Sequence, residues 1–284
     1  MHQFRIHSAR YIRLLIIAAV LIAFSSTSAT AGSPQKKTPT VADVMATIAP
    51  DPLPRKAHNE AYVHIAQPNL FPKKAAANFV IDHNNRNREG IDVSHYQGRI
   101  DWQRVAKDGG VCYAYIKATE GADLVDNMHT INLAAARKAG LKVGSYHFYR
   151  PRASAEQQFL NMTSVVKKSG QDLVPIIDIE DDRAVSEEKF IADLRNFLNR
   201  VTKHYGKRPL LYTGQNFYNK HFQGVFQDYQ WMIAKYQDEA PILLDNHPYS
   251  FWQYTAKGRV AGVNGNVDRS CLIGNATLQS LYLH

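Results

Sequence analysis

The sequence predicts an α/β fold: a (β/α)-type barrel, TIM-like with irregular or shortened helices, that follows an N-terminal extension. From Gly90 onward, short apolar runs alternate with segments of helical periodicity, which is typical of a parallel sheet. Residues 89–284 hold seven or eight such runs, enough strands to close a barrel. A doubly wound open sheet is the alternative, although no glycine-rich phosphate loop follows any of the runs.

The first 31 residues have the composition of a secretory signal peptide. Arginines without acids come first, the apolar run 14–24 follows, and Ala29-Thr30-Ala31 fits the A-x-A cleavage pattern. The run is shorter than the roughly 20 apolar residues of a spanning helix, so an uncleaved anchor is the weaker alternative. We expect cleavage near Ala31, a secreted or periplasmic product, and no stable membrane anchoring afterwards.

Residues 32–88 are predicted to be an extension or linker, because they show no regular periodicity and contain the proline-rich stretch 50–54. The barrel domain is expected over residues 89–284. The formal net charge of +9 favours anionic surfaces. No lysine- or arginine-rich run and no nucleic-acid motif occurs, so nucleic acid is not an expected partner, and we expect a monomer.

The chain has two cysteines, Cys112 and Cys271, too few for a disulfide scaffold. They could pair in an oxidising compartment or remain buried and free, and the sequence leaves both possibilities open. No cluster of cysteine and histidine has the spacing of a zinc site. Neither a metal nor a cofactor is therefore expected.

Apolar periodicity places the elements in chain order. Strands are expected at 90–93, 111–117, 142–148, 174–180, 209–213, 231–235, 251–254 and 266–269. Helices are expected at 101–107, 128–139, 155–168 and 187–205. The last helix is the clearest, because its apolar residues lie on one face and Gly206 follows its basic last turn.

Four carboxylates lie where predicted strands end: Asp92 in the first, Asp178 and Glu180 in the fourth, and Asp268 in the last. Side chains two apart on a strand point the same way, about 6.6 Å apart, so Asp178 and Glu180 are expected to project together. The carboxyl ends of barrel strands form the active face. Glycoside cleavage needs a proton donor and a group that stabilises an oxocarbenium-like centre, and crowded acids can hold a proton near neutral pH.

Helix or turn capping is the structural alternative for these acids, including Asp92 and Asp268, and a lone D-x-E is weak evidence. However, Pro175-Ile176-Ile177 indicates a buried strand, so two acids at its end cost desolvation free energy unless they have a use.

Aromatic residues form a second group of candidates. Tyr146, Tyr212, Trp231 and Trp252 lie in or at the ends of predicted strands. Sugar rings have apolar faces that stack on aromatic rings, so all four are candidate sugar contacts, with ordinary barrel packing as the alternative. Lys117 and Glu120 are expected to join the acids, because a buried lysine is costly unless it is paired.

Short motifs spread over residues 88–284 resemble, in order, those of the glycoside hydrolase family 25 muramidases, the Chalaropsis-type lysozymes. They read GIDVSHYQG from 90, IDW from 100, YIKATEG from 115, GSYHFYRP from 144, DIE from 178, LYT from 211, WMIAKY from 231, WQY from 252 and VD from 267. The resemblance does not extend to the residues before 88.

This resemblance implies hydrolysis of the β-1,4 bond between N-acetylmuramic acid and N-acetylglucosamine in peptidoglycan glycan strands, with net retention and no metal. Glu180 would be the general acid, and Asp178 would assist the substrate's N-acetyl group as it attacks the anomeric carbon. The other implied catalytic acids are Asp92 and Asp268, and the implied substrate-binding residues are Tyr146, Tyr212, Trp231, Trp252, Lys117, Glu120 and Gln253.

Two other functions remain open. A chitinase-like glycosidase or endo-N-acetylglucosaminidase of the D-x-x-D-x-D-x-E type also uses substrate assistance, but positions 173 and 176 are Leu and Ile where that signature requires Asp. A non-catalytic cell-wall-binding protein normally lacks some of the acids, whereas all four are present here.

Overall fold

The computed structural model describes residues 88–182 and 185–284. The predicted signal peptide, residues 1–31, and nearly all of the predicted extension, residues 32–88, lie outside the described residues. Within the described ranges, none of the helices combines the length and the apolar character that crossing a membrane requires.

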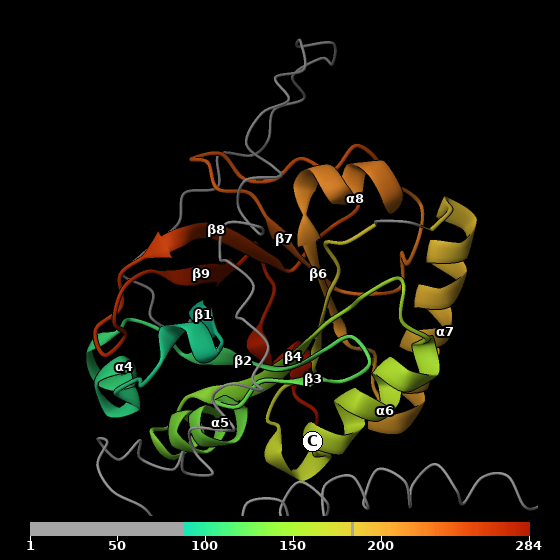
Figure 1. Cartoon of the computed structure of the whole chain (residues 1–284). Coiled ribbons are helices and arrows are strands. Elements are labelled where there is room, and N and C mark those ends of the chain that lie inside the picture. Colours follow the sequence, from blue (N-terminus) through green and yellow to red (C-terminus); the bar gives the residue numbers. More distant parts are fainter. Residues whose placement is uncertain (1–87, 183–184) are drawn as a thin grey trace, which may run out of the picture. The chain divides into compact units, whose positions relative to one another are not determined.

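Eight strands form a closed barrel (Figure 1). Around the ring they are β1 (Glu89–Val93), β2 (Tyr113–Glu120), β4 (Lys142–Phe148), β5 (Ile176–Asp178), β6 (Leu210–Gly214), β7 (Trp231–Ala234), β8 (Phe251–Gly258) and β9 (Val267–Leu272). Neighbouring strands from β1 to β8 are parallel, whereas β9 is antiparallel to both β8 and β1 and closes the ring. A short strand, β3 (Leu124–Val125), pairs with the far end of β2. The predicted barrel is confirmed.

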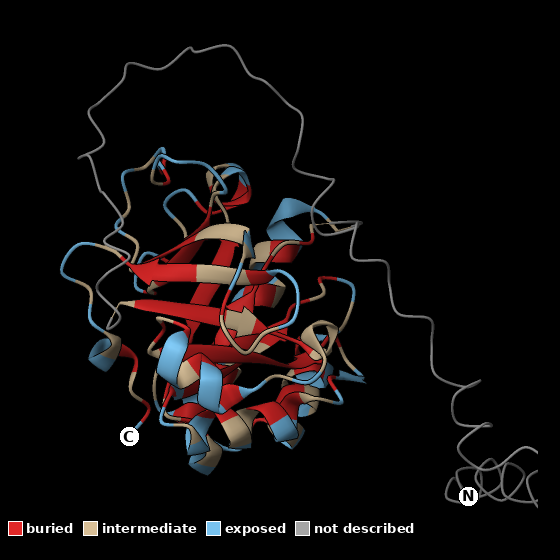
Figure 2. Cartoon of the chain, turned by 90° about the vertical axis from the view of Figure 1, so that its left-hand side faces the viewer, coloured by how far each residue is buried: buried red, intermediate tan, exposed pale blue. Residues whose placement is uncertain are grey.

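The helices surround this ring, and those described are short, as predicted, except for α7. The described α-helices are α4 (Trp102–Asp108), α5 (His129–Lys138), α6 (Ala155–Val165), α7 (Glu187–Tyr205) and α8 (Gln215–His221). The 3-10 helices are η1 (His95–Gln97), η2 (Lys168–Gly170) and η3 (Leu278–Leu281). Figure 2 shows buried strands enclosed by helices whose outer faces are exposed. Between β7 and β8, where every residue is described, there is no helix at all.

Two glycines allow tyrosine side chains to fill the lower half of the barrel. A Cβ atom at Gly90 would lie 2.1 Å from the ring of Tyr113, and one at Gly144 would lie 2.3 Å from the ring of Tyr115. Both tyrosines are fully buried, and the Tyr115 hydroxyl donates to a backbone carbonyl at 3.2 Å. This end of the barrel is therefore packed solid, so a functional site is confined to the other end. We call that end, at the carboxyl ends of β1 to β8, the barrel mouth.

Observed and predicted elements differ mainly at their ends. Strand β5 ends at Asp178, two residues before the predicted end, and the Ile179 N–H makes a last bond to the Tyr212 carbonyl at 2.9 Å. Glu180 consequently lies just past the sheet rather than in it. Helix α8 is absent from the prediction, because Phe217 and Tyr218 are its apolar residues and two adjacent residues show no helical period.

Cys112 and Cys271 are both free. They flank the same residue of β1 from opposite sides: Cys271 pairs with Glu89 in the ladder, and the Cys112 N–H donates to the Glu89 carbonyl at 2.8 Å. Two strand spacings amount to about 9.6 Å, which exceeds the roughly 7 Å between Cα atoms that a disulfide can bridge. In this fold the two thiols cannot pair without a movement of the backbone.

Candidate active site

The four predicted carboxylates come together at the barrel mouth. Asp92 and Asp268 face each other across the β1–β9 ladder, and their side chains are hydrogen-bonded. Asp178 ends β5, and Glu180 follows two residues later. The negative charge of Glu180 raises the pKa of both Asp92 and Asp178, so the strand ends bring the acids within electrostatic reach of one another.

The surroundings of Asp92 favour its protonated form. Burial raises its pKa from 3.8 to about 6, the hydrogen bonds from Gln253 and Asp268 oppose that rise, and the charge of Glu180 adds to it. A carboxyl group with such a pKa exchanges its proton near neutral pH, as an acid–base group must.

Asp178 is more strongly affected. Burial raises its pKa well above the usual value, Glu180 raises it further, and Lys117 acts in the opposite direction. Its Oδ1 atom is buried without a hydrogen-bond partner among the described residues. A buried polar atom left unpaired costs about 1–3 kcal/mol. This oxygen is therefore available to accept a hydrogen bond from a bound molecule.

The Gln253 amide connects the acids to two tyrosines. Its Nε2 donates to Asp92 Oδ2 at 2.9 Å, and its Oε1 accepts from the hydroxyls of Tyr212 at 2.8 Å and Tyr236 at 2.7 Å. The side chain is buried, so these three bonds fix which way the amide points. Sequence reasoning missed Tyr236 as a site residue. It lies two residues past β7 within the WMIAKY motif. Its position just after the end of a strand is the same feature that identified the predicted acids, and it could have identified Tyr236 as well.

Tyr146 and Tyr212 lie close enough to the acids to be affected by their charge, and their role as sugar contacts stays a prediction. Burial is the main cause that raises the pKa of both hydroxyls. The negative charge of Asp92 raises the pKa of Tyr146 further, and that of Glu180 raises the pKa of Tyr212 further. Both phenols therefore remain protonated and can donate hydrogen bonds at the barrel mouth.

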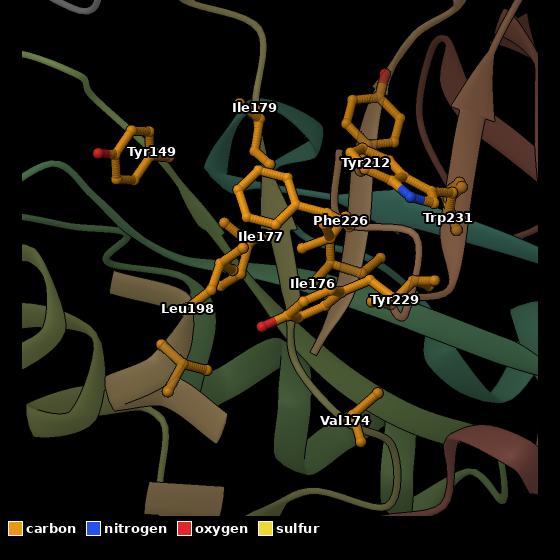
Figure 3. Close-up of a cluster of buried hydrophobic side chains, with 14 of the residues drawn as sticks. Tyr149, Val174, Ile176, Ile177, Ile179, Leu198, Tyr212, Phe226, Tyr229 and Trp231 are labelled. Carbon is orange, nitrogen blue, oxygen red and sulfur yellow. The ribbon is translucent and has the colours of Figure 1, made fainter. Parts of the chain in front are cut away.

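Trp231 and Trp252 lie elsewhere, contrary to the prediction that they stack on sugar. Trp231 is 0% exposed and Trp252 is 1% exposed, so neither ring has a free face. Trp231 belongs to the core cluster in Figure 3, where its ring lies 5.0 Å from that of Tyr218 and 5.1 Å from that of Phe222. The Trp252 indole donates to the Lys235 carbonyl at 2.9 Å. Alternate residues of a strand face opposite sides, and because Gln253 faces inward, Trp252 faces outward.

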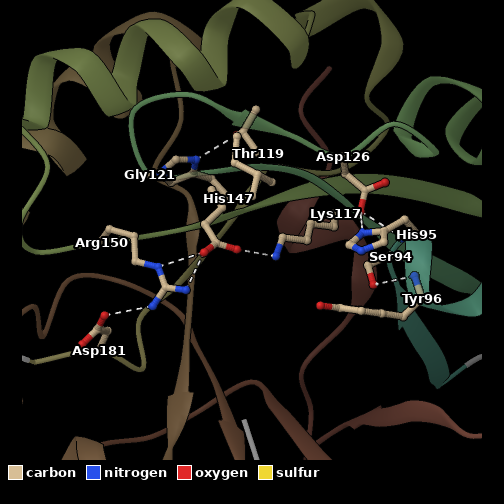
Figure 4. A network of polar contacts seen from close by, with 12 residues as sticks. Ser94, His95, Tyr96, Lys117, Thr119, Gly121, Asp126, His147, Arg150 and Asp181 are labelled. Atoms are coloured by element: carbon tan, nitrogen blue, oxygen red, sulfur yellow. Dashed lines mark hydrogen bonds and ion pairs between the residues drawn. The ribbon is translucent and has the colours of Figure 1, made fainter. Parts of the chain in front are cut away.

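Lys117 and Glu120 form part of a chain of charged side chains across β2, β4 and β5 (Figure 4). Lys117 Nζ donates to Glu120 Oε2 at 2.7 Å, and Arg150 donates from Nε to Glu120 Oε1 at 2.9 Å. Arg150 also binds Asp181 at 2.9 Å. Burial alone would raise the pKa of Glu120, but the two cations outweigh it and lower the pKa. The expectation that the buried lysine is paired is confirmed.

The chemistry of this site is that of carboxylates and phenols. No group of three or more His, Cys, Asp or Glu side chains within residues 88–182 and 185–284 is arranged to hold a metal ion. Asp92 and Asp178, whose pKa values are raised, lie beside a third carboxylate, the partly exposed Glu180. Such a set can move a proton and stabilise a developing positive charge.

Comparison with known proteins agrees with this chemistry. The family model described as glycosyl hydrolases family 25 matches residues 91–263. The Escherichia coli K12 protein YegX, described as uncharacterized, is 38% identical over 196 residues, 68% of this chain and 71% of that protein. Lysozyme M1 of Streptomyces globisporus is 34% identical over 202 residues, 66% of this chain and 68% of that protein. The structure of a family 25 glycosyl hydrolase from Bacillus anthracis superposes with a TM-score of 0.63 at 31% identity, covering 69% of this chain and 93% of that one. The predicted resemblance is thus confirmed, and the chain belongs to glycosyl hydrolase family 25 and is a glycoside hydrolase.

Proposed function

We propose that this protein is a secreted N-acetylmuramidase that hydrolyses the β-1,4 bond between N-acetylmuramic acid and N-acetylglucosamine in peptidoglycan. The observation that carries the proposal is the meeting of Asp92, Asp178, Glu180 and Asp268 at one barrel mouth. The similarity to Lysozyme M1 supports the choice of substrate. The predicted signal peptide supports secretion, since peptidoglycan lies outside the cell membrane.

In this proposal Glu180 is the general acid. It is partly exposed at the barrel mouth, where a bound glycan can reach it. Its negative charge raises the pKa of both Asp92 and Asp178. Glu180 donates its proton to the leaving glycosidic oxygen as the bond to the anomeric carbon breaks. The same group then takes a proton from the incoming water, because retention requires the acid of the first step to act as the base of the second.

Asp178 assists the N-acetyl group of the substrate. Its unpartnered Oδ1 accepts the amide N–H, and the amide carbonyl oxygen attacks the anomeric carbon and develops positive charge on the amide. Because burial raises the pKa of Asp178, its ionised form is costly until that positive charge appears. The carboxylate consequently stabilises the transition state more than the ground state. Attack by the substrate's own amide, followed by water, gives net retention.

Asp92, Asp268, Tyr146, Tyr212 and Gln253 complete the site. Their oxygen and nitrogen atoms are hydrogen-bonded to one another or face the acids, so they can position sugar hydroxyls and fix the protonation of the cluster. Lys117, which is paired with Glu120, supports Asp178 by lowering its pKa, although the charge of Glu120 acts in the opposite direction.

The decisive test measures the bond that is cut. Wild-type protein is incubated with purified peptidoglycan, and mass spectrometry identifies the sugar at each new reducing end; muramic acid is expected. N-acetylglucosamine at the reducing end, or release from chitin alone, would exclude the muramidase assignment. Glu180→Gln is expected to lower kcat by about 10²–10⁴-fold while cell-wall binding and folding remain. Lysis at the wild-type rate by this variant would exclude Glu180 as the acid.

A further inference from the structure

A hollow of about 660 Å³ lies at the edge of the barrel, between the start of α4 and the loop that joins β8 to β9. Arg99, Arg104 and Arg259 line it, and all three side chains are exposed. Within residues 88–182 and 185–284 none of the three forms an ion pair or a side-chain hydrogen bond, whereas Arg150, for example, binds two carboxylates. We call these residues the arginine hollow.

Little negative charge balances the three cations. Asp101 is the acid that lines the arginine hollow, and its carboxylate already accepts the backbone N–H of Arg104 at 3.1 Å as the cap of α4. Guanidinium groups that share one hollow repel each other, so the site favours a ligand that brings negative charge. Arginine forks bind carboxylates and phosphates with two parallel hydrogen bonds.

The walls of the hollow are fixed in place. Gly262 has φ +94°, and a Cβ atom there would lie 2.4 Å from the Asp101 carbonyl oxygen, so the loop approaches α4 as closely as a glycine permits. The Asp101 N–H donates to the Gly262 carbonyl at 2.9 Å, and Val260 is buried against the Trp102 and Val105 core. Figure 1 shows the loop between β8 and β9 reaching α4, in agreement with these contacts.

The arginine hollow lies on the same side of the barrel as the acids. Its loop begins at the carboxyl end of β8 and leads into β9, whose second residue is Asp268. Arg99 lies shortly after the carboxyl end of β1, which carries Asp92. Asn264, in the lining, lies four positions before Asp268, and four residues span at most about 14 Å. A group attached to a sugar at the acids can therefore reach the hollow.

We propose that the arginine hollow binds the carboxylates of the peptide arm that N-acetylmuramic acid carries in peptidoglycan. The inference rests on the proposed muramidase function, because only that substrate bears such an arm next to the bond that is cut. The arm contains free carboxylates, and three to five residues of it extend about 10–17 Å. The hollow thus selects glycan that still carries its peptides over bare glycan.

The test compares two substrates and two variants. The substrates are soluble glycan chains with peptide arms, and the same chains after an amidase has removed the arms, both free of phosphate polymers. Arg104→Gln/Arg259→Gln removes two charges from the hollow. Lys138→Gln/Lys203→Gln is the matched control, because both lysines are exposed near the carboxyl ends of α5 and α7, which precede strands and lie at the opposite end of the barrel.

The arginine variant is expected to lose about tenfold in kcat/KM on the arm-bearing chains and less than about twofold on the bare chains. The control is expected to match wild type on both. Equal losses on the two substrates, or no loss on either, would overturn the proposal. Whole cell walls that retain phosphate polymers serve as an additional substrate. A loss seen only on these walls would overturn the peptide assignment in favour of phosphodiesters.

A separate measurement distinguishes failure of this proposal from failure of the proposed function. If wild type cleaves neither substrate, the muramidase assignment fails. Calorimetric titration with a free acidic tetrapeptide of the arm then tests the hollow alone. Binding by wild type and the lysine control, weakened about tenfold in the arginine variant, supports the arginine hollow; equal binding by all three refutes it.

Discussion

The charge of Asp92 should destabilise the fold, and Asp92→Asn measures by how much. The carboxyl has a pKa of about 6 in the folded chain against 3.8 as the ordinary value. At about 1.36 kcal/mol per pH unit this difference corresponds to about 3 kcal/mol, and partial exposure of the side chain reduces it to about 2 kcal/mol. Asparagine keeps an oxygen for Gln253 and a donor for Asp268, so the substitution removes the charge and little else.

The sign follows from the direction of the shift. A raised pKa means that the folded state binds the proton more tightly than the unfolded state, so the contribution of Asp92 to stability is present below about pH 4 and is lost as the pH rises through 6. We therefore expect Asp92→Asn to be about 2 kcal/mol more stable than wild type near pH 8. The two proteins should be equally stable near pH 4, and the variant should lose activity.

Urea titrations from about pH 4 to about pH 8 test this expectation, because the midpoint and slope give the free energy of unfolding at each pH. Asp123→Asn is the control, since that carboxylate is exposed and its removal should change stability by less than about 0.5 kcal/mol throughout. A difference between Asp92→Asn and wild type that does not vary with pH would refute the reasoning. So would a variant that is less stable than wild type near pH 8.

Three further substitutions probe the site and its surroundings. Gln253→Met should cost about 2–3 kcal/mol of stability, because it removes three hydrogen bonds of about 1 kcal/mol each. It should also shift the pH–rate profile to higher pH, because the hydrogen bond from Gln253 lowers the pKa of Asp92. An unchanged profile would contradict this connection between Gln253 and the pKa of Asp92. Trp231→Phe should cost about 1–3 kcal/mol of stability with an unchanged KM for glycan, whereas a raised KM in a stable variant would restore the sugar-stacking role. Lys117→Met should raise the pKa of Asp178 and shift the acid limb of kcat/KM to higher pH, and a shift to lower pH would contradict that sign.

The periodicity of the sequence predicts the barrel well because strand and helix repeats differ clearly in this chain. Strand β4 and helix α7 coincide with the predicted ranges 142–148 and 187–205. The acids are also placed correctly at the barrel mouth, because the carboxyl ends of parallel strands share one face whatever the details of packing.

The direction of the aromatic side chains could not be predicted in the same way. Strands of a parallel barrel are covered on both faces, so the residues on both faces are equally apolar. The alternation of residues along a strand therefore does not show which of them point into the barrel and which point outward. Trp231 and Trp252 illustrate this ambiguity. Tyr236, Arg99 and Arg259 were missed for a different reason: they lie in loops, and only the closed ring brings them to the mouth or beside it. Arg104 lies on α4, and its place beside the other two arginines also follows only from the closed ring.

The closure of the ring by its first and last strands has a consequence for synthesis. Asp92 on β1 meets Asp268 on β9, so the acid cluster requires residues separated by nearly the whole barrel sequence. A growing chain lacks the strand that completes both the barrel and the set of acids until the last strand has been made. The complete set of four acids therefore exists only once the last strand has joined the sheet.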